Sequence, residues 1–347
     1  MVALSFPSFK NEVSVRRSTA ARSSVAALAG LGLLLSACTP QAEAPPEAAA
    51  EGINVVASTN VYGDIVRTIG GDEVSVTAII SKTSQDPHSY EATAQDRLAV
   101  SKADLVLENG GGYDDFIHTL AKDSGLENGK VLNAVEVSGL AHPEEEEHTA
   151  EATGAEATAS ESAGGEAHDH GDLNEHVWYS LPAMERLADD IAARLGELDP
   201  ASASTFDSNA STFKSSLEEL HGKLEALKQT SAGAQVAVTE PVPLYLLEDA
   251  GLVNATPEDY TAAIEEGSDV PPAVLKAATD LVASKSVRLL AYNSQTEGPQ
   301  TESLKAAAET AGVPVVDFNE TLPEGKTYLE WMKDNVDNIS KVLETNS

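Results

Sequence analysis

Two histidines of this chain lie in polar segments whose residue types suit a metal ion. His88 follows Asp86-Pro87 after a strand-like run, and His176 follows Asn174-Glu175 and precedes apolar and aromatic residues. Pro87 fixes its own φ angle and favours an extended Asp86, so the backbone before the first imidazole is stiff. Imidazole nitrogen binds zinc and other divalent transition metals. We therefore predict that His88 and His176 are ligands of one metal ion.

The second half of the chain contributes two more polar segments, each placed where a predicted strand ends. Glu240 follows a strand predicted over residues 235–239, and the segment from Asn293 to Glu297 follows one predicted over residues 287–292. Open α/β sheets bind ligands at the carboxyl ends of their strands. Two imidazoles and a carboxylate form a suitable ligand set for Zn²⁺ or Mn²⁺, with one position left for a side-chain oxygen or a water molecule.

Strands that alternate with helices must position these residues. Apolar runs predict the strands, and segments of helical periodicity lie between them, which favours an α/β fold with parallel sheets built of βαβ units. Phenylalanine and leucine recur at helical spacing over residues 201–229, which predicts one helix about 40 Å long at 1.5 Å per residue. The predicted strands are residues 53–58, 74–80, 103–108, 235–239, 287–292 and 313–318.

The start of the chain has the composition of an export signal followed by a tether. Basic residues precede an apolar stretch over residues 25–35 that is too short to span a bilayer comfortably. The next residues, Leu35-Ser36-Ala37-Cys38, resemble the bacterial lipobox, which implies a signal peptide over residues 1–37 and a lipidated Cys38. Cys38 is the only cysteine, so no intramolecular disulfide can form. Residues 38–52 are rich in alanine, proline and glutamate, which predicts a flexible tether.

An acidic insertion over residues 142–171 interrupts the alternation of strands and helices. It has a run of four glutamates and no apolar periodicity, so we expect a disordered loop. Two interpretations stay open, a solvated acidic linker and a loop that gathers metal ions at low affinity. The net charge of −34 argues against a nucleic-acid partner and favours encounter with cations. The insertion contains four histidines, His142, His148, His168 and His170.

Several segments together resemble the zinc/manganese solute-binding proteins of ABC importers, and the resemblance runs from about residue 53 to the C-terminus. It implies two βα lobes joined by one long rigid helix, with the metal between the lobes. In this chain the helix corresponds to residues 201–229, the N-terminal lobe to 53–200 and the C-terminal lobe to 230–347. The segments that carry the resemblance are residues 86–91, 174–179, 239–252 and 320–323.

The resemblance also implies a ligand set. His88 and His176 match the two histidines of the N-terminal lobe, and Glu240 matches the third ligand, which is histidine in many zinc members and glutamate in many manganese members. The fourth ligand in members that use aspartate lies in the loop after a late strand, where this chain departs from the family. The nearest match there is Glu297, with Asn293 as the alternative, because the threonine before Glu297 is a poor ligand.

The expected function is that of a lipid-anchored, extracytoplasmic receptor that delivers a divalent metal to an ABC permease with its ATPase. We expect a monomer, bound to the membrane through its N-terminal lipid. Zinc is favoured as cargo because of the histidines of the insertion, and manganese is the alternative because of Glu240. A metal-buffering surface protein is another interpretation. A metallohydrolase could use the same ligands, but the chain lacks His-Glu-x-x-His and a candidate general base, so we expect no enzyme activity.

Overall fold

The computed structural model describes residues 52–85, 87–126, 128–140 and 173–345. The chain divides into a unit over Met1–Ala48 and a main unit over Ala49–Ser347, and the described residues all belong to the main unit. None of the described helices is long and apolar enough to cross a membrane. The predicted signal peptide, Cys38 and the four histidines of the acidic insertion, His142, His148, His168 and His170, lie outside the described residues.

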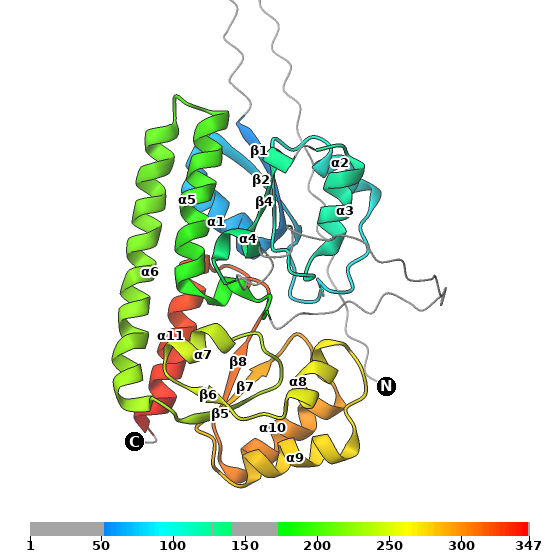
Figure 1. Cartoon of the computed structure of the whole chain (residues 1–347), viewed down its shortest axis with the longest axis vertical. Coiled ribbons are helices and arrows are strands. Elements are labelled where there is room, and N and C mark those ends of the chain that lie inside the picture. Colours follow the sequence, from blue (N-terminus) through cyan, green and yellow to red (C-terminus); the bar gives the residue numbers. More distant parts are fainter. Residues whose placement is uncertain (1–51, 86, 127, 141–172, 346–347) are drawn as a thin grey trace, which may run out of the picture. The chain divides into compact units, whose positions relative to one another are not determined.

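The N-terminal lobe contains a sheet of four parallel strands in the order β2-β1-β3-β4 (Figure 1). Strand β1 is apolar and buried along nearly its whole length, as expected for a parallel strand covered by helices on both faces. The strands are β1 (Ile53–Thr59), β2 (Val74–Ile80), β3 (Leu105–Glu108) and β4 (Val131–Asn133). The helical segments among them are α1 (Asn60–Gly70), η1 (Gly71–Glu73), α2 (Ala94–Val100), α3 (Asp115–Asp123), η2 (Asn128–Lys130) and α4 (Ala134–Ser138).

The C-terminal lobe repeats this arrangement with four parallel strands in the order β6-β5-β7-β8. The predicted α/β fold with two parallel sheets is therefore confirmed. The strands are β5 (Gln235–Val238), β6 (Val253–Asn254), β7 (Leu290–Asn293) and β8 (Val315–Phe318). The helices of this half are α7 (Leu244–Asp249), α8 (Glu258–Glu265), α9 (Pro272–Ala283), α10 (Pro299–Ala311) and α11 (Tyr328–Thr345).

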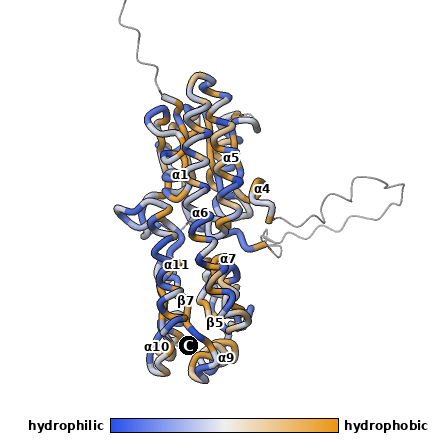
Figure 2. The backbone as a smooth tube through the Cα atoms, turned by 90° about the vertical axis from the view of Figure 1, so that its left-hand side faces the viewer, coloured by the Kyte–Doolittle hydropathy of each residue, from blue (hydrophilic) through white to orange (hydrophobic). Residues whose placement is uncertain are grey.

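Two long helices connect the sheets. Helix α5 (Leu181–Leu198) follows the short turn η4 (Val177–Tyr179), and the Ser180 hydroxyl accepts a hydrogen bond from the Ala183 backbone N–H at its start. Helix α6 (Ala203–Ser231) has 29 residues and packs against α1 and α5 of one lobe and against α7 and α11 of the other (Figure 1). Hydrophobic and hydrophilic positions alternate along both helices (Figure 2), which is the pattern of helices with one buried face.

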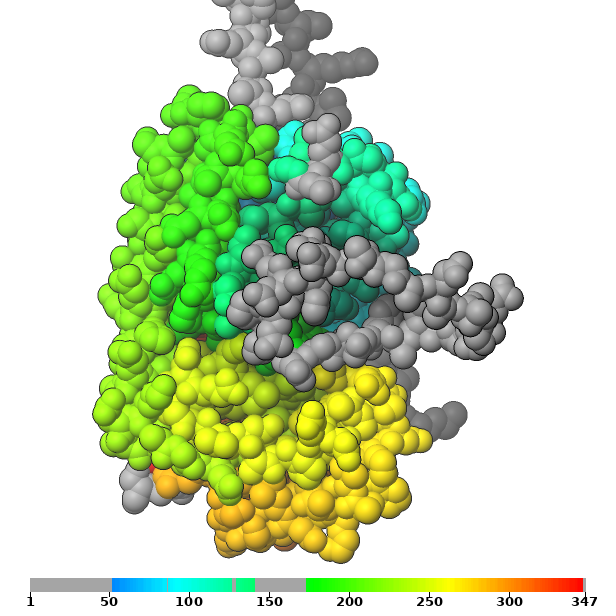
Figure 3. Space-filling model, in the orientation of Figure 1, coloured from blue at the N-terminus to red at the C-terminus, as the bar shows by residue number. Residues whose placement is uncertain are grey.

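The two lobes share one hydrophobic core. It includes Val55 of β1, Leu224 of α6, Val238 of β5 and Ile339 of α11. Figure 3 shows α6 along the edge of the molecule beside both the green and the yellow parts of the chain. A continuous core of this kind resists wide separation of the lobes, since opening would expose apolar side chains to water.

Hydrogen bonds between distant segments add to this core. The Asn60 side chain at the start of α1 exchanges two hydrogen bonds of 2.9 Å with the backbone of Leu322, which follows β8. The Tyr328 hydroxyl of α11 donates to the backbone carbonyl of Trp178, at 2.6 Å. These contacts fix the loop after β8 against the first lobe.

Candidate metal centre

His88 lies in the loop that leaves the carboxyl end of β2, where the sequence places it. Pro87 is buried, and its carbonyl accepts a hydrogen bond from the Tyr90 backbone N–H at 3.4 Å, which closes a turn around the histidine. The His88 side chain is exposed, and its ring meets the ring of Tyr113 edge-on, with centroids 4.9 Å apart. The loop therefore presents one imidazole to the space beyond the sheet edge.

His176 is held in a buried position directly before η4. Its side chain is 1% exposed, and its Nδ1 makes a 2.7 Å hydrogen bond with the Asn174 side-chain oxygen. Burial, and then the neighbouring imidazole of His88, lower the pKa of His176 well below its usual value. The ring is therefore neutral at neutral pH. Because Nδ1 donates to Asn174, Nε2 carries the free lone pair that a metal ion needs.

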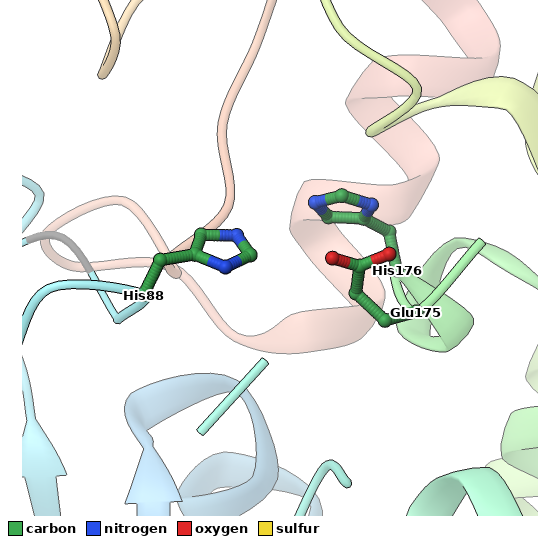
Figure 4. A group of neighbouring side chains, drawn as sticks. All are labelled: His88, Glu175 and His176. Atoms are coloured by element: carbon green, nitrogen blue, oxygen red, sulfur yellow. The ribbon is translucent and has the colours of Figure 1, made fainter. Parts of the chain in front are cut away.

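Glu175 joins these two histidines in one group. A ligand atom from each of His88, Glu175 and His176 lies within 4.8 Å of the other two. Figure 4 shows the His88 ring directed toward His176, with the Glu175 carboxylate beside the His176 ring. Glu175 is 4% exposed, and its Oε1 is buried without a hydrogen-bond partner. An unpaired buried carboxylate is costly unless a cation or a proton compensates it.

A pair of buried carboxylates lies at the sheet edge of the C-terminal lobe. Glu240 follows β5 and Glu320 follows β8, and each is 4% exposed. The Asn293 side-chain amide donates one hydrogen bond to Glu240 and another, of 2.7 Å, to Glu320. The Thr296 hydroxyl also donates to Glu240. Asn293 therefore holds two like charges close together, which is the arrangement that a divalent cation would stabilise further.

Tyr113 links the two groups. Its hydroxyl donates to Glu320 at 3.3 Å, and its ring lies edge-on to both histidine rings, 4.9 Å from His88 and 5.8 Å from His176 by centroid. A cavity of about 690 Å³ includes both His88 and Glu240 in its lining. One imidazole and one carboxylate thus line the same cavity, and Tyr113 connects them to His176 and Glu320.

The two residues predicted for the fourth ligand position, Glu297 and Asn293, make hydrogen bonds to other side chains. Glu297 lines the same cavity, but it is half exposed, accepts a hydrogen bond from the Tyr292 hydroxyl at 3.1 Å and lies 4.0 Å from the Lys305 ammonium group. Asn293 uses its amide nitrogen on the two carboxylates, and its oxygen accepts from the Gln295 backbone N–H at 3.0 Å. Neither side chain joins the histidines in the way that Glu320 does through Tyr113.

Sequence reasoning missed Glu175 and Glu320. The rule that selected Glu240, a polar residue just beyond the carboxyl end of a parallel strand, applies equally to Glu320 after β8. Glu175 precedes His176 directly, so it was available as a candidate from its position alone. Both donors are oxygens, and the group is therefore richer in carboxylate than the sequence predicts.

This donor set fits a divalent transition metal. Two imidazole nitrogens from one lobe and carboxylate oxygens from the other could complete a four-coordinate or larger shell. The buried, unpaired Oε1 of Glu175 and the carboxylate pair held by one amide are the features of a site that a cation would satisfy.

Comparison with known proteins identifies a family for this chain. The family described as "Zinc-uptake complex component A periplasmic" matches residues 55–342. One relative is the "Manganese ABC transporter substrate-binding lipoprotein scaA" of Streptococcus gordonii, 25% identical over 317 residues, or 89% of this chain and 94% of the relative. Another is the "Manganese-binding lipoprotein MntA" of Halalkalibacterium halodurans, 27% identical over 294 residues, or 83% and 87%.

Solved structures share the fold. The crystal structure of ZnuA superposes with a TM-score of 0.62 at 20% identity, covering 85% of this chain and all of that one. The FpvC protein of Pseudomonas aeruginosa, in complex with Mn²⁺, gives a TM-score of 0.63 at 21% identity, with 85% and 100% covered. With the family match spanning both sheets and the helices between them, the chain belongs to the family of periplasmic component A of zinc-uptake complexes.

Proposed function

We propose that this protein captures a divalent transition metal ion between its two lobes and delivers it to an ABC permease with its ATPase. The observation that carries the proposal is the grouping of His88 and His176, which Tyr113 connects to Glu320, while Asn293 joins Glu320 to Glu240. The names of the relatives support it, since scaA and MntA are described as substrate-binding or metal-binding lipoproteins. The family consists of solute-binding proteins and not of enzymes.

We assign the metal ligands to His88, His176, Glu240 and Glu320. The first three are the sequence prediction, and we place Glu320 at the fourth position, for which Glu297 was predicted. What supports Glu320 is its burial, its hydrogen bond from Tyr113 and its shared amide donor with Glu240. Without metal, the Asn293 amide reduces the repulsion between the two carboxylates. With metal, the cation would take over that role.

Manganese is the better supported cargo. Carboxylate oxygens suit Mn²⁺, whereas a zinc site more often gains a third nitrogen or sulfur ligand. The sequence argument for zinc depended on the histidines of the insertion, which lie outside the described residues. Zinc stays the second candidate, because the Irving–Williams order gives it the higher affinity for nearly any such ligand set. A binding assay alone would therefore favour zinc whichever ion is transported.

Membrane attachment through Cys38 and a metal-gathering role of the acidic insertion are part of the proposal. The relatives named above are described as lipoproteins, which supports attachment at the position of the lipobox. The rigid, shared core supports small local shifts at the ligands as the route of release. The monomeric state stays a prediction.

The test measures metal content and affinity in the protein from residue 52 onward, with and without residues 142–171. His176→Ala and Glu320→Gln should each lose the single tightly bound ion, whereas deletion of the insertion should retain it. His118→Ala is the matched control, because His118 is an exposed histidine of the same lobe that pairs with Glu108. Uptake of manganese and zinc by cells that carry each variant identifies the cargo. Retention of the ion by both site variants would refute the proposal.

A further inference from the structure

The proposed ligands leave one buried carboxylate of the cleft without a role. Glu175 is nine-tenths buried or more, its Oε1 has no partner, and its carboxylate lies within 4.8 Å of a nitrogen of His88 and of His176. Its own backbone is fixed, since the Glu175 carbonyl accepts a hydrogen bond from the Asn109 side-chain amide at 3.0 Å. The carboxylate is therefore held in place, and the unused oxygen is a structural feature of the site.

Glu175 faces a different cavity from the one that contains Glu240. This second cavity, of about 510 Å³, is lined by His88 and Glu175 on one side and by Glu258 and Glu265 of α8 on the other. Glu240 and Glu320 are absent from its lining, and so are lysine and arginine among the described residues. The two cavities adjoin, because His88, Glu265 and Glu266 line both this cavity and the one with Glu240. A cation that enters through the second cavity passes the exposed Glu258 and Glu266 before it reaches the buried Glu175.

The electrostatics of this cavity are strongly negative. Glu265, whose Oε1 is also buried without a partner, has a pKa raised to about 8 by burial first and then by the charges of Glu175, Glu240 and Glu320. The neighbouring carboxylates thus create a negative field around Glu265, in which its protonated form is favoured. A field of this kind concentrates cations at the mouth of a cleft.

We propose that Glu175 is a capture carboxylate: the incoming ion is bound first by Glu175, His88 and His176 in the N-terminal lobe alone, and then exchanges Glu175 for Glu240 and Glu320. This proposal rests on the proposed function and adds an order of ligand exchange to it. Its consequence is kinetic, since Glu175 governs how fast the ion arrives, whereas Glu240 and Glu320 govern how long it stays.

The test is stopped-flow binding of Mn²⁺ to the full-length protein, followed through the fluorescence of Trp178, whose ring lies 5.2 Å from that of His176. Chelation by excess EDTA gives the dissociation rate constant. Glu175→Gln should lower the association rate constant about tenfold and leave dissociation within about twofold, since the carboxylate that first contacts the ion is lost but no final ligand is. Glu240→Gln should instead accelerate dissociation.

Glu258→Gln is the matched control, because Glu258 is an exposed carboxylate that lines the same cavity. This substitution removes the same charge as Glu175→Gln. If direct binding of the ion by Glu175 decides the rate, Glu258→Gln should change the association rate constant by no more than about twofold. If the long-range negative field of the cavity decides it, the two variants should slow association equally. Glu175→Asp keeps the charge and should stay within about threefold of wild type in association, which provides a second variant if Glu175→Gln does not fold.

Three results would overturn the capture role. In the first, Glu175→Gln dissociates as fast as Glu240→Gln. In the second, Glu175→Gln and Glu258→Gln slow association equally. In the third, the association rate constant of Glu175→Gln is unchanged. A wild-type protein that shows no Mn²⁺-dependent signal would instead refute the proposed function itself, so the two failures are distinct.

Discussion

The Asn293 side chain offers the sharpest test of how the carboxylate pair is stabilised. Its amide donates to both Glu240 and Glu320, and all three residues are at most 4% exposed. A hydrogen bond to a charged group contributes about 1.5–3 kcal/mol, so Asn293→Ala should cost about 3 kcal/mol after water fills part of the space. Such a loss corresponds to roughly 6 °C in the melting temperature of a protein of this size.

Asn293→Asp should cost more, because it removes the donor and adds a third negative charge. Two unit charges about 4 Å apart repel by about 4 kcal/mol at an effective dielectric constant of 20. The added carboxyl can avoid this repulsion by taking up a proton, which costs about 1.4 kcal/mol for each unit by which its pKa must rise. We expect a total of about 5 kcal/mol at pH 8 and less at pH 5, where the added carboxyl is protonated.

The assay is thermal unfolding of the metal-free and Mn²⁺-loaded proteins at both pH values. Mn²⁺ should stabilise Asn293→Asp more than Asn293→Ala, because the cation neutralises the added charge. Asn133→Asp is the control, since Asn133 donates to the buried carboxylate of Glu108 at 2.9 Å in the N-terminal lobe. It should destabilise without any added rescue by metal. Equal metal-induced shifts in the two Asn293 variants would refute the electrostatic reasoning.

Three further predictions concern the scaffold. Tyr328→Phe should lower the free energy of unfolding by about 1–3 kcal/mol in urea titrations, because it leaves the buried carbonyl of Trp178 without its donor; an unchanged midpoint would contradict this. Leu224→Ala on α6 should cost about 2–5 kcal/mol by the same measurement, since the side chain is fully buried in the shared core. Burial raises the pKa of Asp114 to about 6, so its contribution to stability is present below pH 4 and is lost as the pH rises through 6. Between pH 4 and 7, the free energy of unfolding of Asp114→Asn should therefore fall by up to about 3 kcal/mol less than that of the wild type. Parallel pH profiles of the free energy of unfolding in the two proteins would exclude this contribution.

The fold could be predicted well from the sequence because its main elements have strong local signals. The strand Val74–Ile80 has the bounds that its apolar run predicts, and the helix predicted over residues 201–229 lies at Ala203–Ser231. Strands β4 and β6 and helix α4 were not predicted. They have three, two and five residues, too few for any periodicity to appear.

The candidate site was harder, because its composition depends on contacts between distant segments. His88 and His176 could be selected from their own neighbours in sequence, and the structure brings them together. The proximity of Glu320 to Glu240 depends on the amide of Asn293, and its link to the histidines depends on Tyr113, 207 residues earlier in the chain. No local pattern records either contact, so the family resemblance led to Glu297 in the loop after β7, and Glu320 was not considered.

The position of α11 has a consequence for how the chain reaches its final state. The Tyr328 hydroxyl and backbone N–H of this last helix bond to Trp178 and Asp64, and its apolar face lies in the core that also contains β1. The first sheet therefore lacks part of its packing until α11 has been synthesised. We expect no stable folded intermediate in a ribosome-bound chain that ends before α11. Such a chain should remain open to protease until α11 emerges, and we expect that the two lobes do not fold one after the other.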